Sequence, residues 1–193
     1  EKQICMNDYK YVDLILGKQC QTKMGRGGIH PLEFKTFSKE MQNAITNYCQ
    51  AGGNFFVSGA YVASDLWDNR LVKANEEDKK FAMEVLKYKW RVGQAARNGK
   101  VKSVASPFPE ITGSYTYYQD LNPESYVVES PDALEPAAQG AFTILRYSEN
   151  NLSAGIAYKG NYKTCVLGFP FEAIRTVTER ELLMKAILTF FEH

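Results

Sequence analysis

Nucleophilic catalysis by serine or cysteine needs an activated hydroxyl or thiol, a base within hydrogen-bond reach and a third group that orients the base. The chain has only two histidines. His193 is the terminal residue, and His30 lies in a glycine-containing loop before a proline, where we expect a structural role. Ser58 follows an apolar run, but the Gly-x-Ser-x-Gly elbow is absent. The sequence therefore disfavours a serine–histidine hydrolase, and a pairing of Cys20 with His30 on the same long loop stays as a minor alternative.

Glu172 is the carboxylate whose place in the chain best suits a ligand or a transferred proton. It follows an apolar strand, and open α/β sheets bind ligands beyond the carboxyl ends of their strands. A helix cap is the more ordinary role for such a residue. Asp65 and Asp68 could pair with Glu172 in space, as the two-carboxylate chemistry of glycoside hydrolysis requires. Three exposed tyrosines on a predicted strand could stack on sugars or simply pack in a sheet: Tyr115, Tyr117 and Tyr118.

One stretch, residues 52–65, must position these groups, and it reads as a helix stop, a buried strand, a tight turn and a new helix. Residues 55–57 are apolar without alternation, as in a strand covered on both faces of a parallel sheet. Small side chains follow at residues 58–60, where the backbone must turn sharply. Upstream, residues 11–17 predict a strand and residues 36–51 an amphipathic helix. Strand, helix and strand together predict a right-handed crossover with parallel strands.

The rest of the chain predicts an antiparallel elaboration and a closing helix. Residues 97–100 predict a hairpin turn between strands at residues 90–95 and 101–106. Thr178 and Glu181 have the spacing of a capping box at the start of the last helix. Further strands are predicted at residues 112–119, 141–147, 153–159 and 162–168. The whole chain, residues 1–193, is therefore predicted to be one α/β domain with an antiparallel insertion.

Bulk composition excludes several classes of function. With 193 residues, 45% apolar and 23% charged, the chain has the profile of a soluble globular protein. The formal net charge is +1 and no Lys/Arg stripe is present, so we expect neither a nucleic-acid partner nor binding to an anionic membrane. No apolar run approaches the roughly 20 residues of a membrane span, and no signal peptide opens the chain. Because the chain begins at Glu1 without Met, we expect a processed or excised protein.

The cysteines predict no metal site, and we expect no cofactor. Their spacing is neither CxxC nor CxxH, which argues against zinc. A disulfide between Cys5 and Cys20 would suit a secreted protein. Cys49 lies on a predicted helix face and Cys165 in an apolar strand, so both are expected to be small buried hydrophobes.

Two stretches together resemble the class I glutamine amidotransferase-like superfamily: GGNFFVSGAYVASDL at residues 52–66 and VLGFPFE at residues 166–172. The resemblance implies a flavodoxin-like three-layer α/β sandwich with a mostly parallel sheet. Matched residue by residue, Glu172 falls on the triad glutamate, Pro170 on the triad histidine, and Ala60 or Tyr61 on the nucleophilic cysteine. Two of the three catalytic residues are therefore replaced, and glutaminase activity is not expected.

More narrowly, the strings GGNFFVSGAYVASDL, YKTCVLGFPFEAI and GAFTILRYS…AGIAYKG resemble a domain of secreted bacterial proteins labelled xanthan lyase or golvesin-type. The resemblance covers about residues 11–191. It implies a secreted, periplasmic or cell-surface location and a strand and helix before Val12 that this chain lacks, or from which it has been excised.

Our leading interpretation is a degenerate amidotransferase-like domain that serves as a binding or structural module, with carbohydrate or other domains of its parent protein as partners. The alternative is a polysaccharide lyase or hydrolase. A lyase would need Arg175 or a lysine to converge with Tyr61 and Glu172 near a sugar carboxylate. The pocket hypothesis centres on Ser58, Tyr61 and Glu172, with Asp65 close by, and requires that aromatic side chains leave the space beside the turn open.

Overall fold

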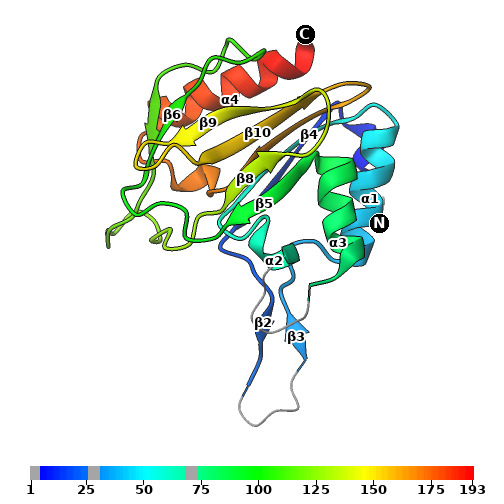
Figure 1. Ribbon diagram of the computed structural model, residues 1–193, viewed down its shortest axis with the longest axis horizontal. Coiled ribbons are helices and arrows are strands. Elements are labelled where there is room, and N and C mark those ends of the chain that lie inside the picture. The colour runs from blue at the N-terminus through cyan, green and yellow to red at the C-terminus, as the bar shows by residue number, and fades with distance from the viewer. Residues whose placement is uncertain (1–4, 26–30, 68–73) are drawn as a thin grey trace.

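A seven-stranded sheet forms the centre of the computed structural model, which describes residues 5–25, 31–67 and 74–193 (Figure 1). Its strands, in spatial order, are β1 (Tyr11–Gly17), β4 (Asn54–Gly59), β11 (Lys163–Leu167), β10 (Ser153–Lys159), β9 (Ala141–Tyr147), β6 (Lys100–Ser103) and β7 (Ser114–Thr116). β1, β4 and β11 are parallel neighbours, and the other pairs are antiparallel. β1, β4, β11, β9 and β7 thus run one way, and β10 and β6 run the other way.

Helices cover both faces of this sheet, which confirms a three-layer α/β fold. On one face lie α1 (Lys39–Gln50), α3 (Glu76–Phe81), the π-helical turn η2 (Ala82–Leu86) and a ribbon of β5 (Tyr88–Val92) with β8 (Ala133–Pro136). The long α4 (Val177–Glu192) covers the other face. Alternation along β4 serves both layers, because Phe55 and Val57 pack under α1 whereas Phe56 packs under α4.

The helix ends follow local capping chemistry. α1 begins after Ser38, whose hydroxyl accepts from the Met41 N–H at 3.3 Å, so the helix starts later than the predicted residue 36. The capping box of α4 is formed by Thr176 and Glu179, not by Thr178 and Glu181 as predicted. Thr176 is the residue with extended backbone (φ −100°, ψ 144°), and only from that conformation can its hydroxyl reach the Glu179 N–H.

The predicted hairpin between residues 90–95 and 101–106 is wrong. β5 pairs with β8, and β6 pairs with β9 and β7. The Asn98–Gly99 turn does form, with Gly99 at φ +61°, but its carbonyl accepts from the Tyr117 N–H at 2.8 Å. The turn therefore carries the chain from the ribbon to the sheet edge instead of folding it back on itself.

All four cysteines are free, so the predicted Cys5–Cys20 disulfide is not formed in the structure. Cys49 and Cys165 are buried, as predicted. Among the described residues, no helix is long and apolar enough to cross a membrane, and no group of three or more potential metal ligands occurs.

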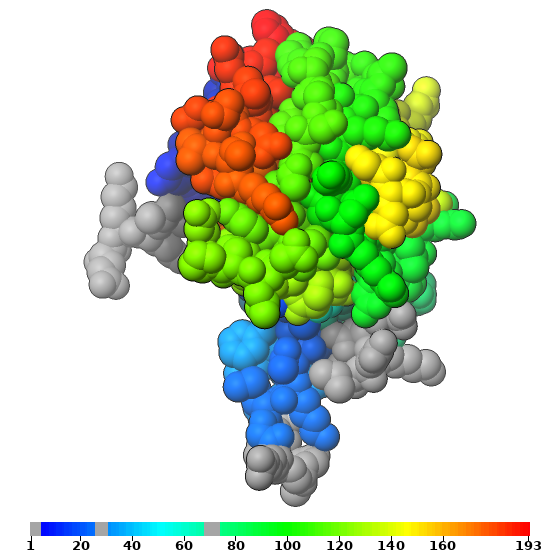
Figure 2. All heavy atoms as spheres, turned by 90° about the vertical axis from the view of Figure 1, so that its left-hand side faces the viewer, coloured from blue at the N-terminus to red at the C-terminus, as the bar shows by residue number. Residues whose placement is uncertain are grey.

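A hairpin arm projects from the body at the end of the sheet where β1 and β4 terminate. It is built from β2 (Thr22–Lys23) and β3 (Leu32–Glu33), and both views show it standing clear of the globular part (Figures 1 and 2). Both strands are exposed throughout. The remaining short elements are η1 (Met6–Asp8), α2 (Ser64–Trp67) and η3 (Phe171–Ala173).

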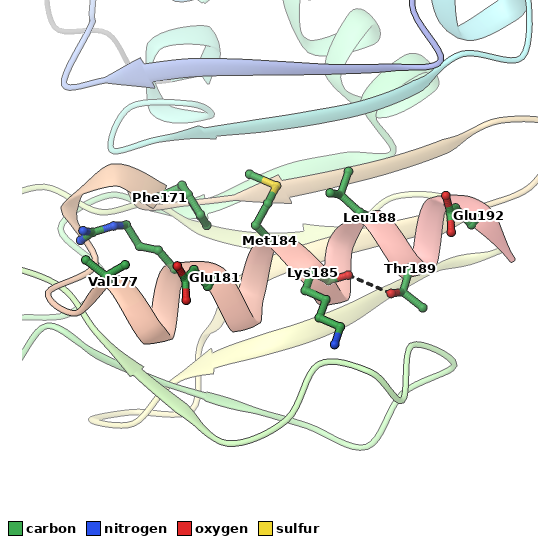
Figure 3. Close-up of a pocket in the computed structure, with 9 residues that line it drawn as sticks. Phe171, Val177, Glu181, Met184, Lys185, Leu188, Thr189 and Glu192 are labelled. Atoms are coloured by element: carbon green, nitrogen blue, oxygen red, sulfur yellow. Dashed lines mark hydrogen bonds between the residues drawn. The ribbon is translucent and has the colours of Figure 1, made fainter.

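An open groove of about 560 Å³ runs along α4. Its apolar lining is Phe171 from η3 together with Val177, Met184 and Leu188, and charged residues of α4 complete it. Figure 3 shows Phe171, Met184 and Leu188 pointing from η3 and α4 toward the strands. We call this feature the α4 groove.

Candidate functional site

The turn after β4, residues 60–63, which we call the elbow, joins the carboxyl ends of the two parallel strands β1 and β4. The Ala60 N–H donates to the Gly17 carbonyl at 2.9 Å, and Ala60 itself is buried. Ser58 is fully buried, and its hydroxyl accepts from the Phe171 N–H at 3.2 Å. The one hydroxyl that sequence reasoning placed at this turn therefore anchors η3 to β4 and is not presented to solvent.

Glu172 lies against the end of β1 and is held by a tyrosine that the sequence did not single out. The Tyr126 hydroxyl donates to Glu172 Oε1 at 2.5 Å. A Cβ on Gly17 would lie 3.2 Å from both of these oxygens, so the pair packs directly on the strand end. Glu172 Oε2 is buried and has no hydrogen-bond partner among the described residues. Burial, followed by the bond to Glu172, raises the pKa of Tyr126. Glu172 thus holds the loop that contains Tyr126 against the end of β1.

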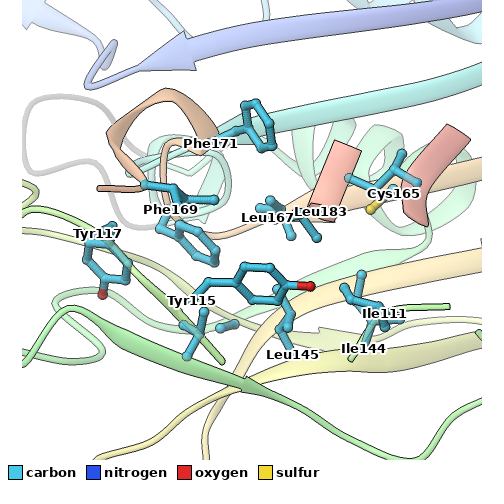
Figure 4. Packing of buried hydrophobic residues seen from close by; sticks show 14 of the residues in the cluster. Ile111, Tyr115, Tyr117, Ile144, Leu145, Cys165, Leu167, Phe169, Phe171 and Leu183 are labelled. Carbon is cyan, nitrogen blue, oxygen red and sulfur yellow. The ribbon is translucent and has the colours of Figure 1, made fainter. Parts of the chain in front are cut away.

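Aromatic side chains pack beside this pair. Phe169 stacks on Tyr117, with ring centroids 5.0 Å apart and planes 14° apart (Figure 4). Phe171 meets Phe56 edge-on, with ring centroids 5.8 Å apart. Pro170, the residue on the triad-histidine position, is buried between them at the start of η3. Tyr61 is half-buried, and burial raises the pKa of its phenol. The two phenylalanines therefore belong to the core under α4.

Asp132 accepts hydrogen bonds from the residues that end the elbow and begin α2. Its side chain is fully buried, and Oδ2 accepts from the Ala63 N–H, the Ser64 N–H and the Ser64 hydroxyl at 2.8, 2.8 and 3.1 Å. These donors open α2, directly after the turn. A carboxylate of the chain itself therefore occupies the N–H groups that an anion or an oxyanion would otherwise use there.

Burial raises the pKa of Asp132 to about 7, against the lowering effect of the bonds from Ser64 and Ala63. The Trp90 indole also acts to lower this pKa, although Trp90 Nε1 and Asp132 Oδ1 fall short of hydrogen-bond geometry and count as unpartnered among the described residues. Trp90 Nε1 and Asp132 Oδ1 are therefore polar neighbours without a hydrogen bond between them. Burial therefore raises the pKa of Asp132 by more than its hydrogen bonds lower it.

The other predicted carboxylates do not join Glu172. Asp65 accepts from the Gln21 N–H at 2.8 Å and from the Thr36 N–H and hydroxyl at 2.9 and 3.1 Å. It thereby holds the two ends of the arm together at its base. Asp68 lies outside the described residues. The carboxylate that does couple to Glu172 is Asp13 on β1: desolvation first, and the charge of Glu172 second, raise the pKa of Asp13 to about 6, although its side chain remains exposed.

The cations expected for a lyase point elsewhere. Arg175 is exposed, lies 3.5 Å from an Asp120 carboxylate oxygen and stacks over the Tyr118 ring at 5.3 Å. Lys18 is the lysine at the elbow, 5.8 Å from the Tyr126 ring centroid, but its ammonium is paired with Glu129 at 2.6 Å. Arg175 therefore does not converge with Tyr61 and Glu172.

The predicted sugar-stacking tyrosines are mostly core residues, which corrects their assignment as exposed. Tyr115 is 3% exposed and Tyr117 is fully buried. Tyr118 is half-buried, and its hydroxyl donates to the exposed Glu124. The Tyr/Thr alternation is that of strand packing in β7 and the segment after it.

Cys20 lacks the environment of a nucleophile. Its pKa is raised, chiefly by burial, so the thiol form dominates, whereas reaction needs the thiolate. Its sulfur lies 3.9 Å from the Thr22 hydroxyl. The proposed partner His30 lies outside the described residues.

Replacing Tyr126 with phenylalanine tests the anchoring role of Glu172. We expect the free energy of unfolding to fall by about 1–3 kcal/mol, because the change removes a hydrogen bond to a carboxylate whose other oxygen is already buried. Urea unfolding measures this. Tyr118→Phe is the matched control, since its hydroxyl bonds an exposed carboxylate and should be worth less than about 1 kcal/mol. Equal losses in the two variants would contradict the anchor.

Comparison with known proteins shows a fold without a family. No family model and no curated protein matches the sequence. The fold of almost the whole chain is shared with part of a β-galactosidase of Rahnella sp. R3, at 12% identity and a TM-score of 0.55 over 96% of this chain and 23% of that one. A GH42 β-galactosidase of G. stearothermophilus matches at 11% identity and a TM-score of 0.54 over 95% of this chain and 22% of its own. This chain therefore spans less than a quarter of either enzyme, and the likeness shows the fold alone.

Proposed function

We propose that this chain is a non-catalytic, amidotransferase-like α/β domain that serves as a binding or structural module of a secreted, glycan-associated protein. The observation that carries the proposal is Asp132. Its carboxylate fills the N–H groups at the start of α2, where such a fold would bind the oxyanion of a reaction intermediate. Ser58 and Glu172, the other groups at the elbow, are each engaged in holding loops together.

The glycan association rests on two supports of different kinds. The sequence strings resemble a domain of secreted bacterial proteins labelled xanthan lyase, and two of the structures with a similar fold are β-galactosidases. Neither support assigns a reaction to this domain. In a multidomain enzyme such a module would hold the catalytic part or its carbohydrate in place, and its partners would be carbohydrate or neighbouring domains.

One observation favours the alternative, an enzyme that acts on polysaccharide. Asp13 and Glu172 interact electrostatically, and the pKa of Asp13 is raised to about 6. A carboxyl group with a raised pKa beside a second carboxylate is the arrangement by which glycosidases supply an acid and a base. On this second reading Asp13 would donate the proton and Glu172 would act as the anion.

Turnover assays separate the two readings. Purified protein should show no hydrolysis of glutamine or of an aryl β-galactoside and no elimination from a uronate-containing polysaccharide. Asp13→Asn and Glu172→Gln are assayed beside it, and all three proteins should be indistinguishable from buffer. Turnover that either substitution lowers by more than about tenfold would overturn the non-catalytic proposal and support the carboxylate pair. Affinity electrophoresis in gels that contain the same polysaccharides then tests glycan binding.

A further inference from the structure

The arm presents apolar side chains to solvent. Phe34, at its base, is 54% exposed, and Met24 and Leu32 are exposed as well. Phe34 also has φ at +65°, a left-handed backbone conformation that costs energy for an aromatic residue. A strained backbone that turns a phenylalanine outward is unfavourable for an isolated arm. It becomes favourable when the ring is covered by another surface.

No described residue covers the α4 groove or the neighbouring edge of the sheet. β1 is the first strand in the sheet order. Alternation places Tyr11, Asp13 and Ile15 on one face of β1, and this is the α4 face, because Tyr11 stacks on Phe191 of α4 with ring centroids 5.8 Å apart. Ile15 is 53% exposed there. An exposed apolar side chain beside an open groove of about 560 Å³ is a feature that a docked partner would cover.

The two features also match in charge. Lys23 on β2 is exposed and has no ion pair or hydrogen bond among the described residues. The side chain of Asp13, on the α4 face of β1, likewise has no ion-pair or hydrogen-bond partner in the described part of the chain. An ammonium that arrived at Asp13 would relieve the repulsion between Asp13 and Glu172. Each copy therefore carries a lysine on its arm and an aspartate beside its groove, and neither side chain is paired with another described residue.

We propose that this chain forms a two-fold dimer by arm exchange, in which residues 22–24 and 32–34 of the arm of each copy pack on the α4 groove of the other copy and Lys23 pairs with Asp13. An arm–groove contact is too small to hold a dimer alone, since stable interfaces bury about 1,200–2,000 Å². Two-fold symmetry makes the contact twice and so doubles the area that it buries. The inference does not rest on the proposed function, because it needs only the exposed side chains of the arm, the α4 groove and the charge of Asp13, whether or not the chain is catalytic.

The mass in solution tests the proposal. Sedimentation equilibrium from micromolar to millimolar concentration should show a dimer for the wild-type chain. Phe34→Ser in the arm and Leu188→Glu in the groove should each weaken association by at least about tenfold, because each removes both contacts of a homodimer. Both residues are exposed, so the monomers should fold normally. Leu121→Ser, at an apolar residue that is 95% exposed in a loop, is the control and should leave the dimer intact.

Two mixing experiments make the result specific. Equimolar Phe34→Ser and Leu188→Glu proteins should form a heterodimer more readily than either forms a homodimer, since one intact arm then meets one intact groove. Lys23→Glu and Asp13→Lys should each weaken the dimer, and the double variant should restore it. A wild-type chain that stays monomeric at millimolar concentration overturns the proposal, as does a dimer that survives both the arm and the groove variants. Failure of the charge swap to restore association overturns the Lys23–Asp13 pairing.

Discussion

Replacing Gly168 with alanine is expected to lower the free energy of unfolding by at least about 3 kcal/mol. An added Cβ would lie 2.0 Å from the Asp132 carbonyl oxygen and 3.0 Å from its carbon. The obstacle is backbone, which cannot rotate away as a side chain would. The chain around Asp132 crosses directly over the end of β11, and only glycine allows that approach.

Neither side of this crossing can retreat without breaking hydrogen bonds. The Asp132 N–H donates to the Gly168 carbonyl at 2.7 Å, and the Gly168 N–H donates to the Ala154 carbonyl at 2.9 Å. The Tyr147 hydroxyl also donates to the Asp132 carbonyl at 2.7 Å. A shift large enough to admit a methyl group would therefore separate β11 from the segment that leads into β8.

Gly93→Ala is the matched control, because a Cβ there would meet its nearest neighbours, Asp132 Oδ1 and Ser64 Cβ, at ordinary distances of 3.6 and 3.9 Å. We expect that change to alter stability by less than about 1 kcal/mol. Urea or thermal unfolding of both variants gives the comparison. A Gly168→Ala protein that fails to accumulate while Gly93→Ala folds is the same result in a stronger form. Equal stability of the two would mean that the crossing is not tight.

Local pattern was sufficient for most elements of the fold. The strands at residues 11–17, 141–147 and 153–159 have the predicted bounds, because each is a run of apolar or alternating residues that ends in glycine or a polar turn. The parallel pairing of β1 and β4 followed from the helix between them. The failed hairpin at residues 90–106 shows where local pattern loses to long-range pairing. Its Asn98–Gly99 turn is present, yet each flanking strand finds a partner far away in the sequence.

Only some residues of the candidate site could be predicted from the sequence. Ser58 and Glu172 were located because they follow apolar strands, and the structure puts both beside the elbow. Tyr126 and Asp132 were missed because their contacts lie 46 and 68 residues away, at Glu172 and Ser64. No spacing rule connects residues across such a distance. The signal that remained was a single acid, Asp132, after a proline in a segment without helical or strand periodicity, which is also what an exposed loop looks like.

Removing the Asp132 carboxylate should lower the free energy of unfolding about as much as the Gly168→Ala substitution does. Asp132→Ala leaves the buried Ala63 N–H and the part-buried Ser64 N–H without an acceptor, at about 1–3 kcal/mol each, so we expect a loss of about 2–5 kcal/mol. Asp132→Asn keeps an acceptor oxygen of the same size and removes the charge. Its stability should lie well above that of the alanine variant at every pH.

The pH dependence distinguishes a buried carboxylate from an ordinary cap. Burial raises the pKa of Asp132 from its usual 3.8 to about 7, so between these values the folded chain holds a proton that the unfolded chain has released. The stability that Asp132 contributes is therefore complete below about pH 4 and is lost as the pH rises through 7. Asp13, with its pKa raised to about 6, acts in the same direction. Because Asp13 is present in both proteins, subtracting the wild-type curve from the Asp132→Asn curve isolates Asp132.

We expect the difference in free energy of unfolding between Asp132→Asn and wild type to grow in favour of the asparagine variant from pH 4 to 7, by on the order of 3 kcal/mol, and then to level off. Urea unfolding at intervals of pH measures it. Parallel curves would mean that Asp132 titrates like an exposed acid. If Asp132→Ala were in addition as stable as wild type, the N–H groups at the start of α2 would be open to solvent or to a ligand, and the argument that the chain fills its own anion site would fail.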